Sequence, residues 1–190
     1  MAFDNDWEFL RAAVPDLQQY ILSKDLYWPL RMSNPTPGAV QIPQLTIGNL
    51  LLAQARLSAL TLDASRSTER DELLGRLQQI REEWRSNWSM KAAHEFSSRL
   101  NLWQQYLREL RGERRAQAVF SNEVRQRVIL SLLQPEILDS IPANEAEQLK
   151  MADDMLRSMT APGSFVWDPE VEKAFPQEPY WFLYGSVRKS

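Results

Sequence analysis

The stretch from Thr68 to about Arg111 constrains the fold more than any other part of the chain. Its apolar residues recur at steps of three and four, which places them on one side of an α-helix. They are Leu73, Leu77, Ile80, Trp84, Trp88, Ala92, Phe96, Leu100, Trp103, Leu107 and Leu110. One helix over the whole span would be about 65 Å long. The pattern predicts a long central helix over 68–111, and the alternative is two helices broken near Ser86 and Asn87.

Signals at both ends support this helix. Thr68 followed by Asp71 resembles a capping box in which Asp replaces the usual Glu. Acidic residues in the first turn suit the helix dipole, and Gly112 is a suitable stop. We therefore expect the helix to begin at Thr68.

Helical patterns also fill most of the remaining chain. Residues 1–31 resemble two short helical pieces, with a fresh start at Pro15. The segment 45–62 is apolar on most of its circumference, so we expect other helices to surround it. A further helix is expected over 114–133, and Asn144 with Glu147 suggests a capping box for the next one. The sequence predicts an all-α bundle of about five to six helices.

The last 27 residues have a different character. They contain three prolines, little periodicity, and seven of the chain's 19 aromatic residues. We expect residues 1–163 to form the helical bundle domain and residues 164–190 to form an irregular, aromatic and proline-rich segment packed on the same domain.

Composition restricts the class of protein. With 190 residues, the chain is long enough for one domain with its own core. It has no cysteine, which excludes disulfides, thiolate nucleophiles and iron–sulfur clusters. The acidic start lacks the pattern of a secretory signal, and the apolar window 45–62 is interrupted by Asn49, Gln54 and Arg56. We expect a cytoplasmic protein without a membrane span.

Residues for catalysis are scarce. His94 is the only histidine, and its position on the predicted helix is far around from the apolar stripe, so we expect it to be exposed and inert. No second histidine is present for a di-iron bundle or for haem ligation, and the scattered glycines form no phosphate-binding loop. We expect no catalytic residues, no metal and no cofactor, so the sequence favours a protein that is not an enzyme.

Charge is distributed unevenly. Seven arginines and three glutamates lie between Arg99 and Arg127, whereas 136–178 holds ten acidic and three basic residues. The simplest interpretation is that the acidic C-terminal third packs beside the arginine-rich segment and neutralises it. A second interpretation is that the arginines form a solvent-exposed helix face. A third is a phosphate-binding patch for nucleic acid, formed by Arg108, Arg111, Arg114 and Arg115.

Two aromatic groups are further candidates. Trp84, Trp88 and Trp103 are expected in the core, and the alternative is a pocket for a planar ligand between helices. Near the C-terminus stand Tyr180, Trp181, Phe182 and Tyr184, which either dock on their own bundle or serve as anchors for another protein or a second subunit.

These observations lead to one principal hypothesis. The sequence lacks the residue combinations that enzymes use for catalysis, and it is rich in aromatic residues near the C-terminus. This favours a non-enzymatic interaction protein, either an adaptor or a structural component that self-associates. The alternatives are a helical nucleic-acid-binding regulator that uses the arginine-rich segment and a small-molecule-binding helical bundle.

Overall fold

The computed structural model describes residues 2–30, 42–111, 117–138 and 141–188. Within these ranges six long helices carry the fold, as the sequence predicts. They are α1 (Ala2–Leu22), α2 (Ile47–Ala59), α3 (Ala64–Glu83), α4 (Arg85–Leu110), α6 (Phe120–Leu133) and α7 (Ala143–Met159).

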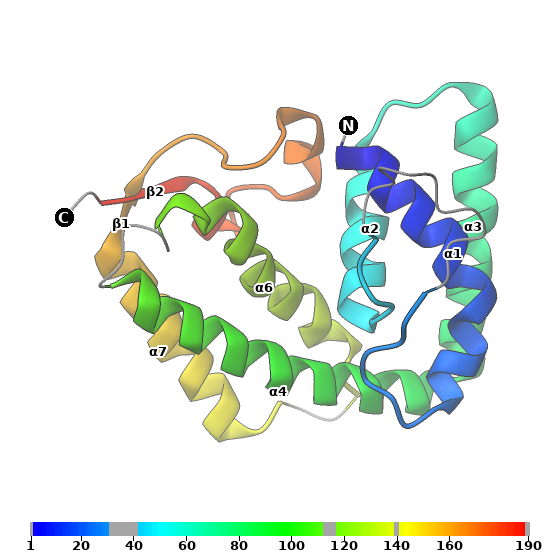
Figure 1. Ribbon diagram of the computed structural model, residues 1–190, viewed down its shortest axis with the longest axis horizontal. Coiled ribbons are helices and arrows are strands. Elements are labelled where there is room, and N and C mark those ends of the chain that lie inside the picture. Colours follow the sequence, from blue (N-terminus) through cyan, green and yellow to red (C-terminus); the bar gives the residue numbers. More distant parts are fainter. Residues whose placement is uncertain (1, 31–41, 112–116, 139–140, 189–190) are drawn as a thin grey trace.

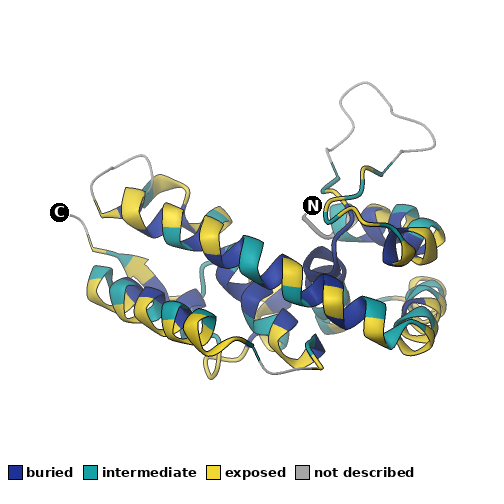
Figure 2. Ribbon diagram, turned by 90° about the horizontal axis from the view of Figure 1, so that it is seen from below, coloured by how far each residue is buried: buried dark blue, intermediate teal, exposed yellow. Residues whose placement is uncertain are grey.

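The longest helix, α4, joins two groups of elements. Figure 1 shows α1, α2 and α3 at one end of α4, and α6, α7 and the C-terminal segment at the other. The helix α4 packs against both groups, and α2 also packs directly on α6. Figure 2 shows that the buried residues face inward between these elements. The predicted central helix therefore has its expected role.

The predicted span 68–111 is divided at Trp84, as the alternative anticipated, two residues before Ser86. Trp84 has a non-helical backbone (φ −112°, ψ 36°) between the end of α3 and the start of α4. Its backbone still joins the two helices, because its N–H donates to Ile80 O and its carbonyl accepts from Trp88 N. The apolar stripe continues through the break, which is why the residue pattern alone did not locate it.

The predicted start at Thr68 is wrong. The helix α3 begins at Ala64, and its cap is Asp63, whose Oδ1 accepts from Arg66 N at 2.9 Å. Inside the helix, the Thr68 hydroxyl donates to Ala64 O at 3.0 Å. Because Asp63 caps the first turn of α3, Thr68 lies inside the helix, where no cap is needed.

Two other predicted helix boundaries are also wrong. Residues 2–22 form one helix that includes Pro15, instead of two pieces. The buried stripe runs past the proline from Leu10 to Leu17, and its packing in the core stabilises the helix despite one lost hydrogen bond. The cap of α7 is Pro142, without a side-chain hydrogen bond, so Asn144 and Glu147 form no capping box.

The segment 45–62 behaves as predicted. Its helix α2 begins after Thr46, whose hydroxyl oxygen accepts from Asn49 N at 3.1 Å, and most of its residues are buried. None of the described helices has the length and apolar character needed to cross a membrane.

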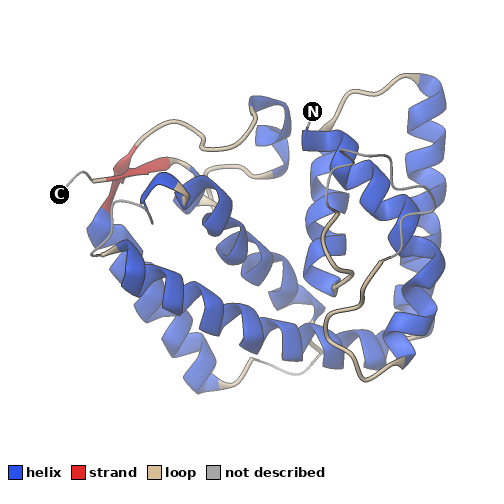
Figure 3. Ribbon diagram, in the orientation of Figure 1, coloured by secondary structure: helices blue, strands red, loops and turns tan. Residues whose placement is uncertain are grey.

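The C-terminal segment follows α7 with little regular structure. Figure 3 shows a short antiparallel pair, β1 (Thr160–Pro162) and β2 (Gly185–Val187), in which Ala161 faces Ser186. Between the strands lie two 3₁₀ turns, η2 (Pro169–Ala174) and η3 (Trp181–Leu183). A third, η1 (Gln134–Glu136), extends α6. The strand pair brings the end of the segment back to the end of α7.

Candidate functional site

The aromatic side chains of the C-terminal segment pack on one another in a chain of edge-to-face contacts. Ring centroids are 5.2 Å apart for Phe175 and Tyr180, 6.0 Å for Tyr180 and Phe182, and 5.6 Å for Trp181 and Phe182. This geometry is the one that aromatic quadrupoles favour. The segment thus folds as a connected aromatic cluster on the same chain.

Burial divides the four predicted interaction residues. Phe182 is buried in the core, together with Phe175 and Leu183. Tyr180, Trp181 and Tyr184 are half-buried and keep part of their surface at the outside. Part of the predicted anchor set therefore contributes to the stability of the fold, and three of its members retain accessible surface.

A surface groove lies where this cluster meets the end of α7. Its cavity volume is about 330 Å³, and its walls include Trp181, Phe182 and Tyr184. The exposed guanidinium groups of Arg157 and Arg188 also line it. We call this hollow the C-terminal groove. It combines apolar ring surface with two positive charges.

Both arginines of the C-terminal groove are held in place. The Arg157 guanidinium stacks on the Trp181 ring, with 3.7 Å between its central carbon and the ring centroid. Arg188 donates from Nε to Thr160 O at 3.1 Å, and its backbone N–H donates to Met159 O. The remaining guanidinium nitrogens of each residue can therefore meet a ligand without a large loss of side-chain entropy.

The tyrosines beside the groove keep their protons at neutral pH. Burial raises the pKa of Tyr180 and of Tyr184, and the nearby Glu172 raises the pKa of Tyr184 further. Tyr184 uses its hydroxyl to donate to Phe175 O at 2.8 Å. The groove therefore carries no phenolate charge that would oppose an acidic ligand.

Buried ion pairs form a second feature, which the sequence analysis did not anticipate. Glu95 is fully buried; one carboxylate oxygen accepts from Gly48 N at 2.8 Å and the other lies 3.0 Å from Arg99. Arg99 also donates to Gln126 at 2.8 Å. The spacing of Glu95 and Arg99 is an ordinary surface i, i+4 pattern, so only the neighbouring helices reveal that the pair is buried.

Further ion pairs connect the acidic third of the chain to arginines. Arg127 on α6 donates two hydrogen bonds to Asp153 on α7, from Nε at 2.7 Å and from Nη2 at 2.9 Å, one to each carboxylate oxygen. Glu136 accepts from Arg81 at 2.6 Å and from the indole N–H of Trp88 at 2.9 Å. The predicted neutralisation is confirmed for the pair Arg127–Asp153, which links the two charge-rich segments.

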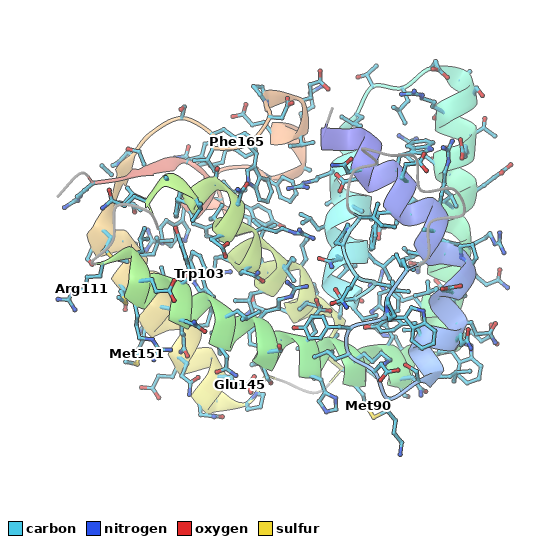
Figure 4. All side chains as sticks on the ribbon, in the orientation of Figure 1. Met90, Trp103, Arg111, Glu145, Met151 and Phe165 are labelled. Carbon is cyan, nitrogen blue, oxygen red and sulfur yellow. The ribbon has the colours of Figure 1, made fainter. Side chains whose placement is uncertain are left out.

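The predicted phosphate-binding arginines lie around the end of α4. Arg108 and Arg111 are exposed, and Figure 4 shows Arg111 pointing away from the domain. Arg114 and Arg115 lie outside the described residues. A nucleic-acid patch at these four positions stays a prediction.

The predicted tryptophan pocket also stays a prediction. Trp88 and Trp103 are fully buried in the hydrophobic core, and Trp84 packs against it. Trp103 stacks on Tyr106 at 5.6 Å between ring centroids. The expected core position is confirmed for Trp88 and Trp103, whereas Trp84 is half-buried; the expected exposure of His94 is confirmed.

Comparisons with known proteins give no family for this chain. No protein-family model, curated protein or solved structure matches it.

Proposed function

We propose that this chain is a non-enzymatic protein-interaction protein that binds its partner through the C-terminal groove. The observation that supports this most is the Arg157–Trp181 stack, at 3.7 Å, on the wall of an accessible aromatic hollow. Tryptophan, tyrosine and arginine are the residues that most often dominate binding energy at protein interfaces. All three are present here on one small surface.

The surface around the groove suggests the chemistry of the partner. Arg157 and Arg188 both line the groove, so an acidic side chain would find a positive charge at either arginine. The rings of Trp181 and Tyr184 offer apolar area for a neighbouring apolar side chain. The expected occupant is an acidic protein segment with one apolar anchor residue, supplied by another protein or by a second copy of this chain.

A point substitution tests this better than removal of the segment. Deleting 165–190 would remove Phe175, Phe182 and Leu183 from the core, so the truncated chain would lose stability whatever the segment binds. Trp181→Ala and Arg157→Gln change the groove and leave those three residues in place. Met151→Ala, at an exposed apolar residue on α7, is the matched control.

The experiment is a selection of displayed peptides against the full chain, followed by affinity measurement on the three variants. We expect the selected peptides to combine acidic residues with an apolar anchor. Their Kd should rise by about tenfold or more, that is by at least ~1.4 kcal/mol, in Trp181→Ala and in Arg157→Gln, and stay unchanged in Met151→Ala. Sedimentation of the chain alone reports self-association. If no peptide is enriched and the chain stays monomeric, or if binding survives both groove substitutions, the proposal is wrong.

A further inference from the structure

A second hollow lies between α2, the start of α6 and the C-terminal segment. Its cavity volume is about 460 Å³. Arg56 of α2 and Arg125 of α6 line it, together with Ser121, Asn122 and Trp167. We call it the arginine pocket. It is separate from the C-terminal groove and shares no lining residue with it.

Arg125 lines this pocket and carries one donor that no described residue satisfies. Its Nη2 donates to Asn49 Oδ1 at 2.6 Å, whereas its Nε is buried and has no hydrogen-bond partner among the described residues. Leaving a charged donor buried and unpaired costs free energy, so such groups in native proteins call for an explanation. The Arg125 guanidinium is therefore incompletely hydrogen-bonded by the described residues.

Arg56 is fixed by contacts on two sides. Its guanidinium lies over the Trp167 ring, 4.4 Å from the centroid, and 3.6 Å from Asp6 Oδ2. The second distance is too long for a hydrogen bond. Trp167 is itself anchored, because its indole N–H donates to Ser121 O at 2.7 Å. The wall that carries Arg56 is therefore pre-organised.

The charges around the two arginines come from a small set of residues. Glu95 is already paired with Arg99, so Arg56 and Arg125 share Asp6 as their remaining buried carboxylate among the described residues. Burial, followed by repulsion from Arg99 and Arg56, lowers the pKa of Arg125 to about 10. Burial also raises the pKa of Asp6, although Arg56 and Arg125 act to lower it. An added anion would relieve the repulsion between the guanidinium groups.

One lining residue opposes an anion. Asp168 also borders the pocket, and its Oδ1 accepts from Glu170 N at 3.1 Å, where it caps η2. Within the lining, two arginines face this one carboxylate; Asp6, which lies 3.6 Å from Arg56 but does not line the pocket, brings the local carboxylates to two.

We propose that the arginine pocket binds the phosphate group of a small organic phosphomonoester. Arg56 and Arg125 supply charged donors, and the Ser121 hydroxyl and the Asn122 amide supply neutral ones. A phosphate has three oxygens for such a set, and arginine forks match its geometry. The volume is within the range of small-molecule sites, and Val166 and Val171 line the pocket for the organic part.

The test uses the full-length ¹⁵N-labelled chain at low ionic strength, with inorganic phosphate and phenyl phosphate as probes. The cross-peak of the Arg125 Nε–H group, identified by its loss in Arg125→Gln, should shift saturably with both probes. Phenyl phosphate should bind more tightly, because Val166 and Val171 line the pocket and offer apolar surface for its ring. Calorimetry should give a Kd that is about tenfold higher or more in Arg125→Gln.

Two further variants make the test specific. Ser121→Ala changes an exposed lining residue, so it probes the pocket even if Arg125→Gln does not fold, and it should weaken binding several-fold. Arg76→Gln is the matched control at an exposed arginine of α3, and its affinity should equal that of the wild type. No saturable shift up to about 10 mM probe, or equal losses in Arg76→Gln and Ser121→Ala, would overturn the proposal. Peptide binding at the C-terminal groove is measured separately and does not depend on this outcome.

Discussion

Gly48 leaves no room for a side chain, and replacing it by alanine gives a quantitative test of the packing between α2, α4 and α6. A Cβ added there would lie 2.7 Å from Glu95 Oε1 and 3.2 Å from Glu95 Cδ, and even closer to Ile129 Cγ2. Gly75 in α3 is the matched control, because an added Cβ there has no neighbouring atom within 4 Å. The two substitutions are chemically identical, so they separate packing from backbone effects.

The expected changes have opposite signs. Alanine in place of glycine inside a helix stabilises it by about 1 kcal/mol. At Gly48, overpacking costs about 1–3 kcal/mol. Displacement of Glu95 from Gly48 N loses a charged hydrogen bond worth about 1.5–3 kcal/mol. We therefore expect Gly48→Ala to lower the free energy of unfolding by about 3 kcal/mol, and Gly75→Ala to raise it by about 0.5–1 kcal/mol.

Urea unfolding followed by circular dichroism measures both changes, and calorimetry measures the midpoints. For a chain of this size, ~1 kcal/mol shifts Tm by about 2–4 °C, so Gly48→Ala should lower Tm by about 6–12 °C. A Gly48→Ala protein as stable as the wild type, with Gly75→Ala behaving as expected, would refute the close contact between α2, Glu95 and Ile129.

Two further predictions concern the charged residues. Arg127→Lys keeps the charge but loses the paired hydrogen bonds to Asp153, and the Arg127 side chain is only 9% exposed. We therefore expect urea unfolding to show a free energy of unfolding that is lower by about 1–3 kcal/mol. A change below about 0.5 kcal/mol would contradict this. Asp6 has a pKa raised by burial, despite the attraction of Arg56. The native state therefore holds this proton more tightly than the unfolded state, and the contribution is present at low pH and lost as pH rises through the folded pKa. The stability of Asp6→Asn relative to the wild type should increase as pH rises above about 4, the ordinary aspartate value, and a decrease would disprove the assignment.

Residue spacing was sufficient to predict the helices because their apolar faces are long and regular. The stripe from Leu73 to Leu110 identified α3 and α4, and the apolar circumference of 45–62 identified α2. The capping signals at the helix ends were less informative, because more than one residue near each end can act as an N-cap. Asp63 took the position expected for Thr68, and Pro142 precedes α7 in place of a cap by Asn144.

The charged sites depend on contacts between distant segments, which spacing does not encode. One local signal did point to the arginine pocket. Arg56 interrupts a helix that is otherwise apolar nearly all round, and an arginine in such a position needs a partner from another element. Its partners, Asp6 and Trp167, come from the first helix and the last segment, about fifty residues before and more than one hundred after it in sequence. No pattern within a single helix could have identified them.

The same contacts explain the charge asymmetry of the sequence more fully than neutralisation does. Three arginines on three helices lie over aromatic rings of the C-terminal segment: Arg56 of α2 over Trp167, Arg127 of α6 over Phe182, and Arg157 of α7 over Trp181. A guanidinium over a ring gains both electrostatic attraction and contact area, so a segment without regular structure can be fixed at several points. The arginines of this chain therefore pair with rings as well as with acids. Arg127 also donates two hydrogen bonds to Asp153 of α7. This one side chain of α6 therefore contacts both the C-terminal segment, through Phe182, and α7.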